Sequence, residues 1–157
     1  MNGKLTATEI QEVLTKNTLG RIGCNDGYHT YIIPINYVYD GKYILCHSQL
    51  GKKIQIMRQN PKVCFEVDEI IHFSNWKIVV VLGEYQELIK ERDRYSTMQF
   101  FLNKMLHVKI SETAKPGEVY ANSAFAPALT QTTKPIIYRI YIEETSGRGE
   151  RDSTWVS

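Results

Sequence analysis

The stretch HTYIIPINYVYDGKYILCHSQLGKK, from His29 to Lys53, decides the expected fold. Two β-rich runs flank Asp40-Gly41, and Asp-Gly between such runs is a strong signal for a tight hairpin. Pro34 lies within the first run and cannot donate a ladder hydrogen bond to a neighbouring strand. We therefore expect an edge strand, a bulge or an end of pairing at Pro34, where something other than a strand can face the backbone.

The second run leads into a polar cluster at the start of a predicted short helix. Lys52 and Lys53 follow Gly51, where the free backbone amides and the positive end of the helix dipole favour an anion. Ser48 adds a hydroxyl donor, and His47 ends the strand in the same neighbourhood. The pattern fits a phosphate-bearing ligand lying across the strands, but a solvated lysine pair beside a structural histidine fits it as well.

The rest of the chain reads mainly as strands. Thr6 and Glu9 form a capping box for a helix that ends near Asn17, and Gly83 marks a bend or bulge in a long strand. Helices are also expected from Gly51 to about residue 60 and over 91–108, and strands over 19–24, 28–39, 42–48, 62–68, 76–89 and 134–147. About six strands with helices outside them predict a mainly β protein, a six-stranded antiparallel barrel with peripheral helices.

Two segments show no clear period. Residues 109–133 are rich in Ser, Thr, Ala and Pro, which predicts a long loop and a candidate lid over a ligand pocket. The charged end of the chain predicts a frayed tail, in which Trp155 is a candidate for docking. We expect a single domain over residues 1–148 and a tail over 149–157.

Composition narrows the possible partners. The 157 residues carry a net charge of only +2, so no global field favours nucleic acid or a membrane surface, and a bound anion must be held locally. No signal peptide or membrane-spanning run is visible. Cys24, Cys46 and Cys64 are far apart, which supports neither a zinc site nor a disulfide framework. We therefore expect a cytoplasmic protein with half-buried strand thiols, no metal, and neither nucleic acid nor membrane as a partner.

Several motifs together resemble the FMN-binding split-barrel superfamily, which contains pyridoxamine 5′-phosphate oxidase. Within it, the chain is most similar to the nitroimidazole-resistance (Nim-type) branch. The likeness covers roughly residues 5–148. It rests on the motifs at Gly20-Arg21, Pro34 to Tyr37, His47 to Lys53, Asn60 to Asp68 and Glu143 to Arg148.

The resemblance implies a homodimer with two FMN molecules at the subunit interface. It places Ile33, Pro34, Ile35 and Asn36 along the isoalloxazine, and His47 and Ser48 near the ribityl chain or ring. It also implies that Lys52 and Lys53 hold the phosphate, and that Trp76 and Lys77 approach the flavin from one subunit or the other.

The chain departs from the family pattern in two places. Ile78 occupies a position where relatives often have a polar residue, which puts one flavin contact in doubt. The arginine, histidine and proline arrangement that true pyridoxamine phosphate oxidases use for substrate is not visible near the C-terminus. We therefore do not expect oxidation of pyridoxamine phosphate.

The leading hypothesis is a flavoprotein reductase that passes reducing equivalents from a nicotinamide or other donor to a small nitroaromatic or quinone-like acceptor. The lysines would be anchors, while His47 is the candidate catalytic residue that donates a proton or hydrogen bond. The donor stays open because no GxGxxG fingerprint is present. The alternative is a non-catalytic flavin- or haem-binding protein of the same fold, with His29, His47, His72 and His107 as candidate axial ligands.

Overall fold

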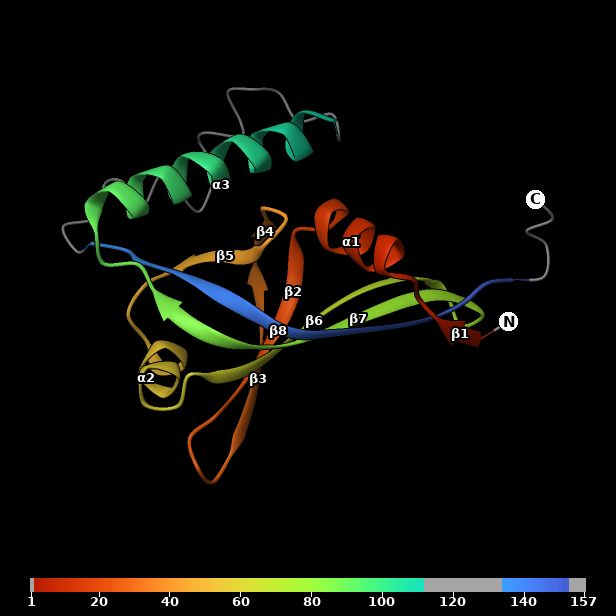
Figure 1. Ribbon diagram of the computed structural model, residues 1–157, viewed down its shortest axis with the longest axis horizontal. Coiled ribbons are helices and arrows are strands. Elements are labelled where there is room, and N and C mark those ends of the chain that lie inside the picture. Colours follow the sequence, from red (N-terminus) through yellow and green to blue (C-terminus); the bar gives the residue numbers. More distant parts are fainter. Residues whose placement is uncertain (1, 112–133, 153–157) are drawn as a thin grey trace.

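The computed structural model describes residues 2–111 and 134–152, which form a curled antiparallel sheet with helices outside it (Figure 1). The strands are β1 (Asn2–Lys4), β2 (Leu19–Asn25), β3 (Thr30–Asn36), β4 (Val38–Tyr39), β5 (Tyr43–Ser48), β6 (Lys62–His72), β7 (Asn75–Glu87) and β8 (Ile136–Glu150). The helices are α1 (Ala7–Lys16), α2 (Lys52–Gln59) and α3 (Glu91–Ser111). Hydrogen bonds connect the strands in the order β3-β2-β6-β7-β8-β5-β4, and β1 pairs with β8.

The order of the strands requires the sheet to close on itself. β3 and β4 stand at the two ends of the hydrogen-bonded order, yet only Tyr37 separates them in the chain. The backbone N–H of Tyr37 donates to the carbonyl of Thr18, at 2.9 Å. One residue can bridge the two ends only if the sheet curls until they meet. The mainly β split-barrel class predicted from the sequence is thereby confirmed.

The interior is filled by side chains that alternate along the strands. Ile22, Phe65, Val79 and Ile140 are fully buried there. The Tyr37 hydroxyl, also buried, donates to the carbonyl of Leu14 in α1 at 2.8 Å. This bond satisfies a buried polar group at the position where the two ends of the sheet meet.

The helices cover selected faces of the barrel. In Figure 1, α1 and α3 lie on one side of the sheet and α2 lies on the other. The capping box of α1 is confirmed: the Glu9 N–H donates to Thr6 Oγ1 at 3.2 Å, and the Thr6 N–H donates to Glu9 Oε1 at 3.1 Å. α3 buries Phe101 against Val38 and Leu45. Tyr95, on the same helix, is 69% exposed and lies outside that contact.

Several boundaries differ from the prediction. The described residues contain eight strands instead of six, because β1 was missed and the run over 28–39 divides into β3 and β4. β8 continues to Glu150, so the tail begins later than expected. α3 extends through Ser111, into the predicted loop. The rest of that loop, 112–133, and Trp155 lie outside the described residues.

The helices of the described residues were compared with the length and hydropathy that a membrane-spanning helix requires. Within residues 2–111 and 134–152, each helix is too short or too polar to cross a bilayer.

Candidate functional site

The candidate site lies where β5 ends and α2 begins. We call this group the α2 corner, comprising His47, Ser48, Gly51, Lys52 and Lys53. β5 is held between β8 and β4, which fixes the position of its last residues. α2 starts at Lys52 with Gly51 as its N-cap, so the helix start predicted near Gly51 is confirmed.

The first turn of α2 is electrostatically prepared for an anion. Gly51 provides no side-chain cap, and the first turn contains no acidic residue. Its amide N–H groups have no partner within the helix, and the positive end of the helix dipole is there. Lys52 and Lys53 place positive charge at the positive end of the helix dipole, which is unfavourable in the isolated helix. A bound anion would interact favourably with both the lysines and the dipole. The chemistry of this donor set fits a phosphate group.

The two lysines have different surroundings. Lys52 is exposed, and its Nζ lies 4.4 Å from the ring centroid of Tyr31 on β3. The Tyr31 hydroxyl raises the pKa of the Lys52 ammonium, and Asp26 adds to the effect. Lys53 is half-buried, and its charge acts on the thiols of Cys24 and Cys46 and on His47. Lys52 therefore faces β3, whereas the charge of Lys53 acts on Cys24 of β2 and on Cys46 and His47 of β5.

His47 is half-buried at the end of β5. Its ring meets the Phe101 ring edge to face, with centroids 4.9 Å apart and planes at 86°. Burial, with a smaller contribution from the Lys53 ammonium, lowers the pKa of His47 below its ordinary value of 6.5. Burial thus favours the neutral imidazole, in which one ring nitrogen is an N–H donor and the other an acceptor.

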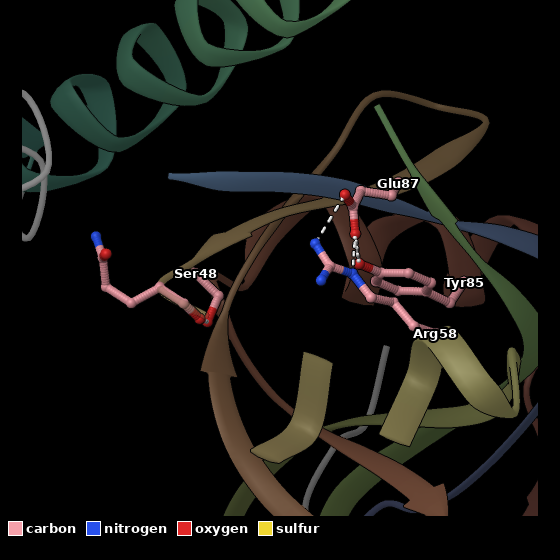
Figure 2. A network of polar contacts seen from close by, with 5 residues as sticks. Ser48, Arg58, Tyr85 and Glu87 are labelled. Carbon is pink, nitrogen blue, oxygen red and sulfur yellow. Dashed lines mark hydrogen bonds and ion pairs between the residues drawn. The ribbon is translucent and has the colours of Figure 1, made fainter. Parts of the chain in front are cut away.

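Ser48 and the four residues expected on β3 do not form one continuous surface. The Ser48 hydroxyl donates to the carbonyl of Gln49 at 2.8 Å (Figure 2). β3 is an edge strand, which is one of the three alternatives predicted from Pro34. Along it, Ile33 packs against the core and Ile35 is buried, whereas Pro34 and Asn36 are exposed. The four residues thus present alternate faces, with one backbone edge in common.

The expected adjacency of β3 and β5 is wrong. The sequence interpretation placed the polar residues on adjacent strands of one hairpin, but β5 pairs with β4 and β8. The chain crosses from β3 to β4 at Tyr37, and pairing restarts on the other end of the sheet. The α2 corner contacts β3 through Lys52 and Tyr31.

Trp76 and Lys77 lie far from the α2 corner within one chain. They begin β7 and pair with Glu150 and Gly149 of β8. The other end of β7, Glu87, contacts α2. The ten residues from Lys77 to Glu87 span roughly 30 Å of strand. One copy of the chain therefore does not bring these two groups together.

Two features near α2 were missed by sequence reasoning. Tyr31 contacts Lys52, although nothing in the local pattern connects them. At the opposite end of α2, Arg58 contacts Glu87 and, through it, Tyr85. Twenty-nine positions separate Arg58 from Glu87, so only a basic residue in the last turn of the helix hinted at this network.

The four histidines proposed as axial ligands occupy different places. His29 lies beside the β2–β3 turn, His72 ends β6, and His107 is on α3; all three are exposed. His72 contacts Asp152, with Nε2 and Oδ2 3.5 Å apart. Only His47, among these four, is at the α2 corner.

The outer face of the barrel contains a row of residues across four strands. Ile32 of β3, Gly23 of β2, Cys64 of β6 and Leu82 of β7 are successive cross-strand partners. Ile32 is 73% exposed and Leu82 is 46% exposed, and an open pocket of about 410 Å³ is lined by Gly23, Cys64 and Leu82, among others. The three cysteines were expected to be half-buried on strands, but Cys24 and Cys46 are buried and Cys64 is exposed.

Comparison with known proteins identifies the family. The family model described as Pyridoxamine 5′-phosphate oxidase matches residues 6–149. The chain therefore belongs to the pyridoxamine 5′-phosphate oxidase family, and the resemblance seen in its motifs is confirmed. An uncharacterised protein of Rhizobium meliloti, RA0666, is 40% identical over 84 residues, which cover 54% of this chain and 56% of that protein.

Solved structures agree with this assignment. An FAD-binding protein of Mesorhizobium loti is 30% identical, with 97% of this chain and 98% of that chain covered and a TM-score of 0.72. The FAD binding protein of Mycobacterium smegmatis is 23% identical, with 96% and 100% covered and a TM-score of 0.66. A Bacteroides thetaiotaomicron protein described as a candidate 5-nitroimidazole antibiotic resistance protein is 12% identical, with 95% and 87% covered and a TM-score of 0.68. The last two show the fold alone.

Proposed function

We propose that this chain is a flavoprotein that binds FMN with its phosphate at the α2 corner. The main support for a phosphate site is the start of α2, which has no side-chain cap, bears Lys52 and Lys53, and has no acidic residue in its first turn. Support comes from the M. loti protein, which is named as FAD-binding and matches nearly the whole chain at 30% identity.

We further propose that the bound flavin passes reducing equivalents from a nicotinamide or other donor to a small nitroaromatic or quinone-like acceptor. The flavin supplies the redox chemistry when bound, and the protein orients it and controls its surroundings. The neutral His47 would donate a hydrogen bond to the acceptor. Lys52 and Lys53 would act only as anchors for the phosphate.

A second copy of the chain would complete the site. Trp76 and Lys77, which the family resemblance places near the flavin, lie at the end of β7 far from the α2 corner. They could approach the same flavin only from another copy. The exposed Ile32 and Leu82 on the outer face support such an assembly, because both would be removed from water by a partner. We therefore propose a homodimer with FMN between its subunits.

The test of phosphate binding compares FMN, FAD and riboflavin on the full chain. Replacing Lys52 and Lys53 together by Met should weaken FMN binding about tenfold or more, with riboflavin affected much less, because charge-assisted bonds to the phosphate are lost. Fluorescence titration measures both affinities. The matched control replaces Lys16 and Lys42 by Met; Lys42 also lies beside a tyrosine ring, at 5.3 Å from Tyr43, but away from α2.

Equal loss of FMN and riboflavin in the double variant would contradict the proposal, since riboflavin carries no phosphate. FAD binding tighter than FMN binding would reassign the nucleotide while keeping the phosphate site. A Soret band in the spectrum of the purified protein would favour the haem-binding alternative. A bound flavin that stays oxidised with every anaerobic donor would favour a binder without turnover.

A further inference from the structure

α2 is fastened to the barrel at the end opposite its lysines (Figure 2). Arg58, in the last turn, donates from Nε to Glu87 Oε1 at 2.8 Å and from Nη2 to Glu87 Oε2 at 3.1 Å. The Tyr85 hydroxyl donates to Glu87 Oε1 at 2.7 Å. One carboxylate at the end of β7 thus accepts three hydrogen bonds, two of them in the bidentate arrangement that fixes the direction of a guanidinium.

The helix depends on such anchoring because it is weak on its own. It has 8 residues, fewer than the roughly 12 that an isolated helix needs to be even marginally stable. Its N-terminus lacks a side-chain cap and carries two like charges that oppose the dipole. Ile54, Ile56 and Met57 of this helix are buried in the core, and the hydrogen bonds of Arg58 add a directional constraint at its last turn.

The same network reaches the other half of the α2 corner. The Tyr85 ring packs on the ring of Tyr138, with centroids 5.1 Å apart. Tyr138 is the cross-strand partner of Cys46, which precedes His47. The backbone N–H of Tyr85 also donates to the carbonyl of Pro61, just after α2, at 2.8 Å. Tyr85 and Glu87 therefore contact the helix directly and the end of β5 through one ring.

The surroundings of Glu87 favour its ionised form. The Arg58 guanidinium lowers the pKa of the Glu87 carboxyl, and the Tyr85 hydroxyl acts in the same direction. The side chain of Glu87 is only 20% exposed, so water competes less for its oxygens than at a fully exposed ion pair. The pair is thus better placed to hold a fixed geometry than an ordinary surface salt bridge.

We infer that Glu87, through Arg58 and with Tyr85, is a positioning residue that aims the N-terminus of α2 at the phosphate of the flavin. The inference rests on the proposed function, because it assigns the phosphate to the α2 corner. In this role Glu87 acts through Arg58 and contacts neither the flavin nor its acceptor. Its effect would appear as discrimination between phosphorylated and unphosphorylated flavin.

The decisive variant is Glu87→Gln in the full chain, which keeps the size of the side chain and removes its charge. We expect FMN affinity to fall about five- to twentyfold and riboflavin affinity to change less than about twofold. Tyr85→Phe should move FMN affinity in the same direction by a smaller factor. Fluorescence titration gives both affinities, and circular dichroism verifies that each variant is folded.

Glu84→Gln is the matched control. Glu84 is on the same strand and is paired with Lys62, Oε2 to Nζ at 3.3 Å, but that pair does not involve α2. FMN affinity in this variant should stay within about twofold of the wild type. An equal fall in both E84Q and E87Q would overturn the inference, because it would mean that any ion pair on β7 has this effect.

Three further outcomes decide the remaining cases. If E87Q binds FMN as the wild type does, or loses FMN and riboflavin by the same factor, the positioning role is overturned. If E87Q does not fold, Arg58→Lys keeps the cation and removes the bidentate geometry; a selective fall in FMN affinity then supports the role, and its absence overturns it. A wild-type protein that binds FMN no better than riboflavin refutes the phosphate site itself, a result distinct from any failure of E87Q.

Discussion

Glu66 shares one guanidinium with a second carboxylate on the outer face of the barrel. Arg21 Nη1 lies 2.9 Å from Asp68 Oδ2 and 3.6 Å from Glu66 Oε2. Burial, followed by the neighbouring Asp68, raises the pKa of Glu66 to about 7 from 4.5. Between these two values the folded chain binds more protons than the unfolded chain, so the contribution of Glu66 to stability falls as pH rises from 4.5 to 7.

Replacing Glu66 by Gln should therefore stabilise the protein at high pH. At pH 8 the variant removes a charged group that the fold disfavours, and we expect a gain of about 1 kcal/mol after allowance for solvent screening. At pH 5 the wild-type carboxyl is already mostly protonated, so the difference should nearly vanish. Urea unfolding at both pH values measures this. Glu144→Gln, an exposed carboxylate on β8, is the control, and a pH-independent effect of E66Q would contradict the assigned pKa.

For single residues, the sequence predicted which secondary-structure element each one lies in, but not which neighbours its side chain meets. The sequence placed Lys52 and Lys53 in the first turn of a helix, because Gly51 and the apolar residues after it define that start. It could not show that Lys52 contacts the Tyr31 ring, or that the charge of Lys53 lowers the pKa of His47. Those neighbours depend on which strands the closed barrel brings beside α2, and local periodicity carries no such information.

Gly83 shows how a single element constrains its sequence. The pairing of β7 with β8 shifts register between Leu82 and Gly83, which confirms the predicted bulge. A Cβ atom at Gly83 would collide with the carbonyl oxygen of Tyr141 and lie 2.7 Å from Ile140 Cγ2. The backbone of β8 approaches closely here, so only glycine fits without a shift of the strand.

Gly83→Ala should thus lower the free energy of unfolding by about 2–3 kcal/mol, the usual cost of overpacking a closely packed site. Thermal and urea unfolding provide the measurement. Gly3→Ala in β1 is a suitable comparison, because a Cβ there meets no atom within 4 Å, and its effect should be within about 0.5 kcal/mol. A neutral G83A variant would mean that β8 can move away from the bulge at little cost.

Among the elements, those with strong local signals were predicted and those defined by tertiary pairing were not. α1 followed from its capping box and α2 from its start and its Asn-Pro end. β1 was missed because three polar residues have no strand pattern, and they are extended only because β8 offers an edge. The division of the run over 28–39 into β3 and β4 was missed because Tyr37 continues the β-rich composition while the chain changes partners.

The outer face of the barrel formed by β2, β3, β6 and β7 combines exposed apolar side chains with an open pocket. α1 and α3 lie on the same side in Figure 1, while the β2–β3 hairpin projects away on the other. Ile32, Gly23, Cys64 and Leu82 form their row on the outer surface, next to the open pocket. A contact between two copies about a two-fold axis, the commonest symmetry of homo-oligomers, would bury the exposed Ile32 and Leu82.

Leu82→Lys tests whether this face joins two copies. If it does, a buried charge at the centre of the contact should disfavour association, and light scattering should report the mass of one chain, 18.1 kDa, in place of twice that mass for the wild type. FMN content should fall with it, because Trp76 and Lys77 of the second copy would be withdrawn. Ile89→Lys, at a site 72% exposed and beyond the end of β7, should change neither quantity. A wild-type protein that scatters as one chain while retaining FMN would exclude a flavin site shared between subunits, and a dimeric L82K would place the contact on another face.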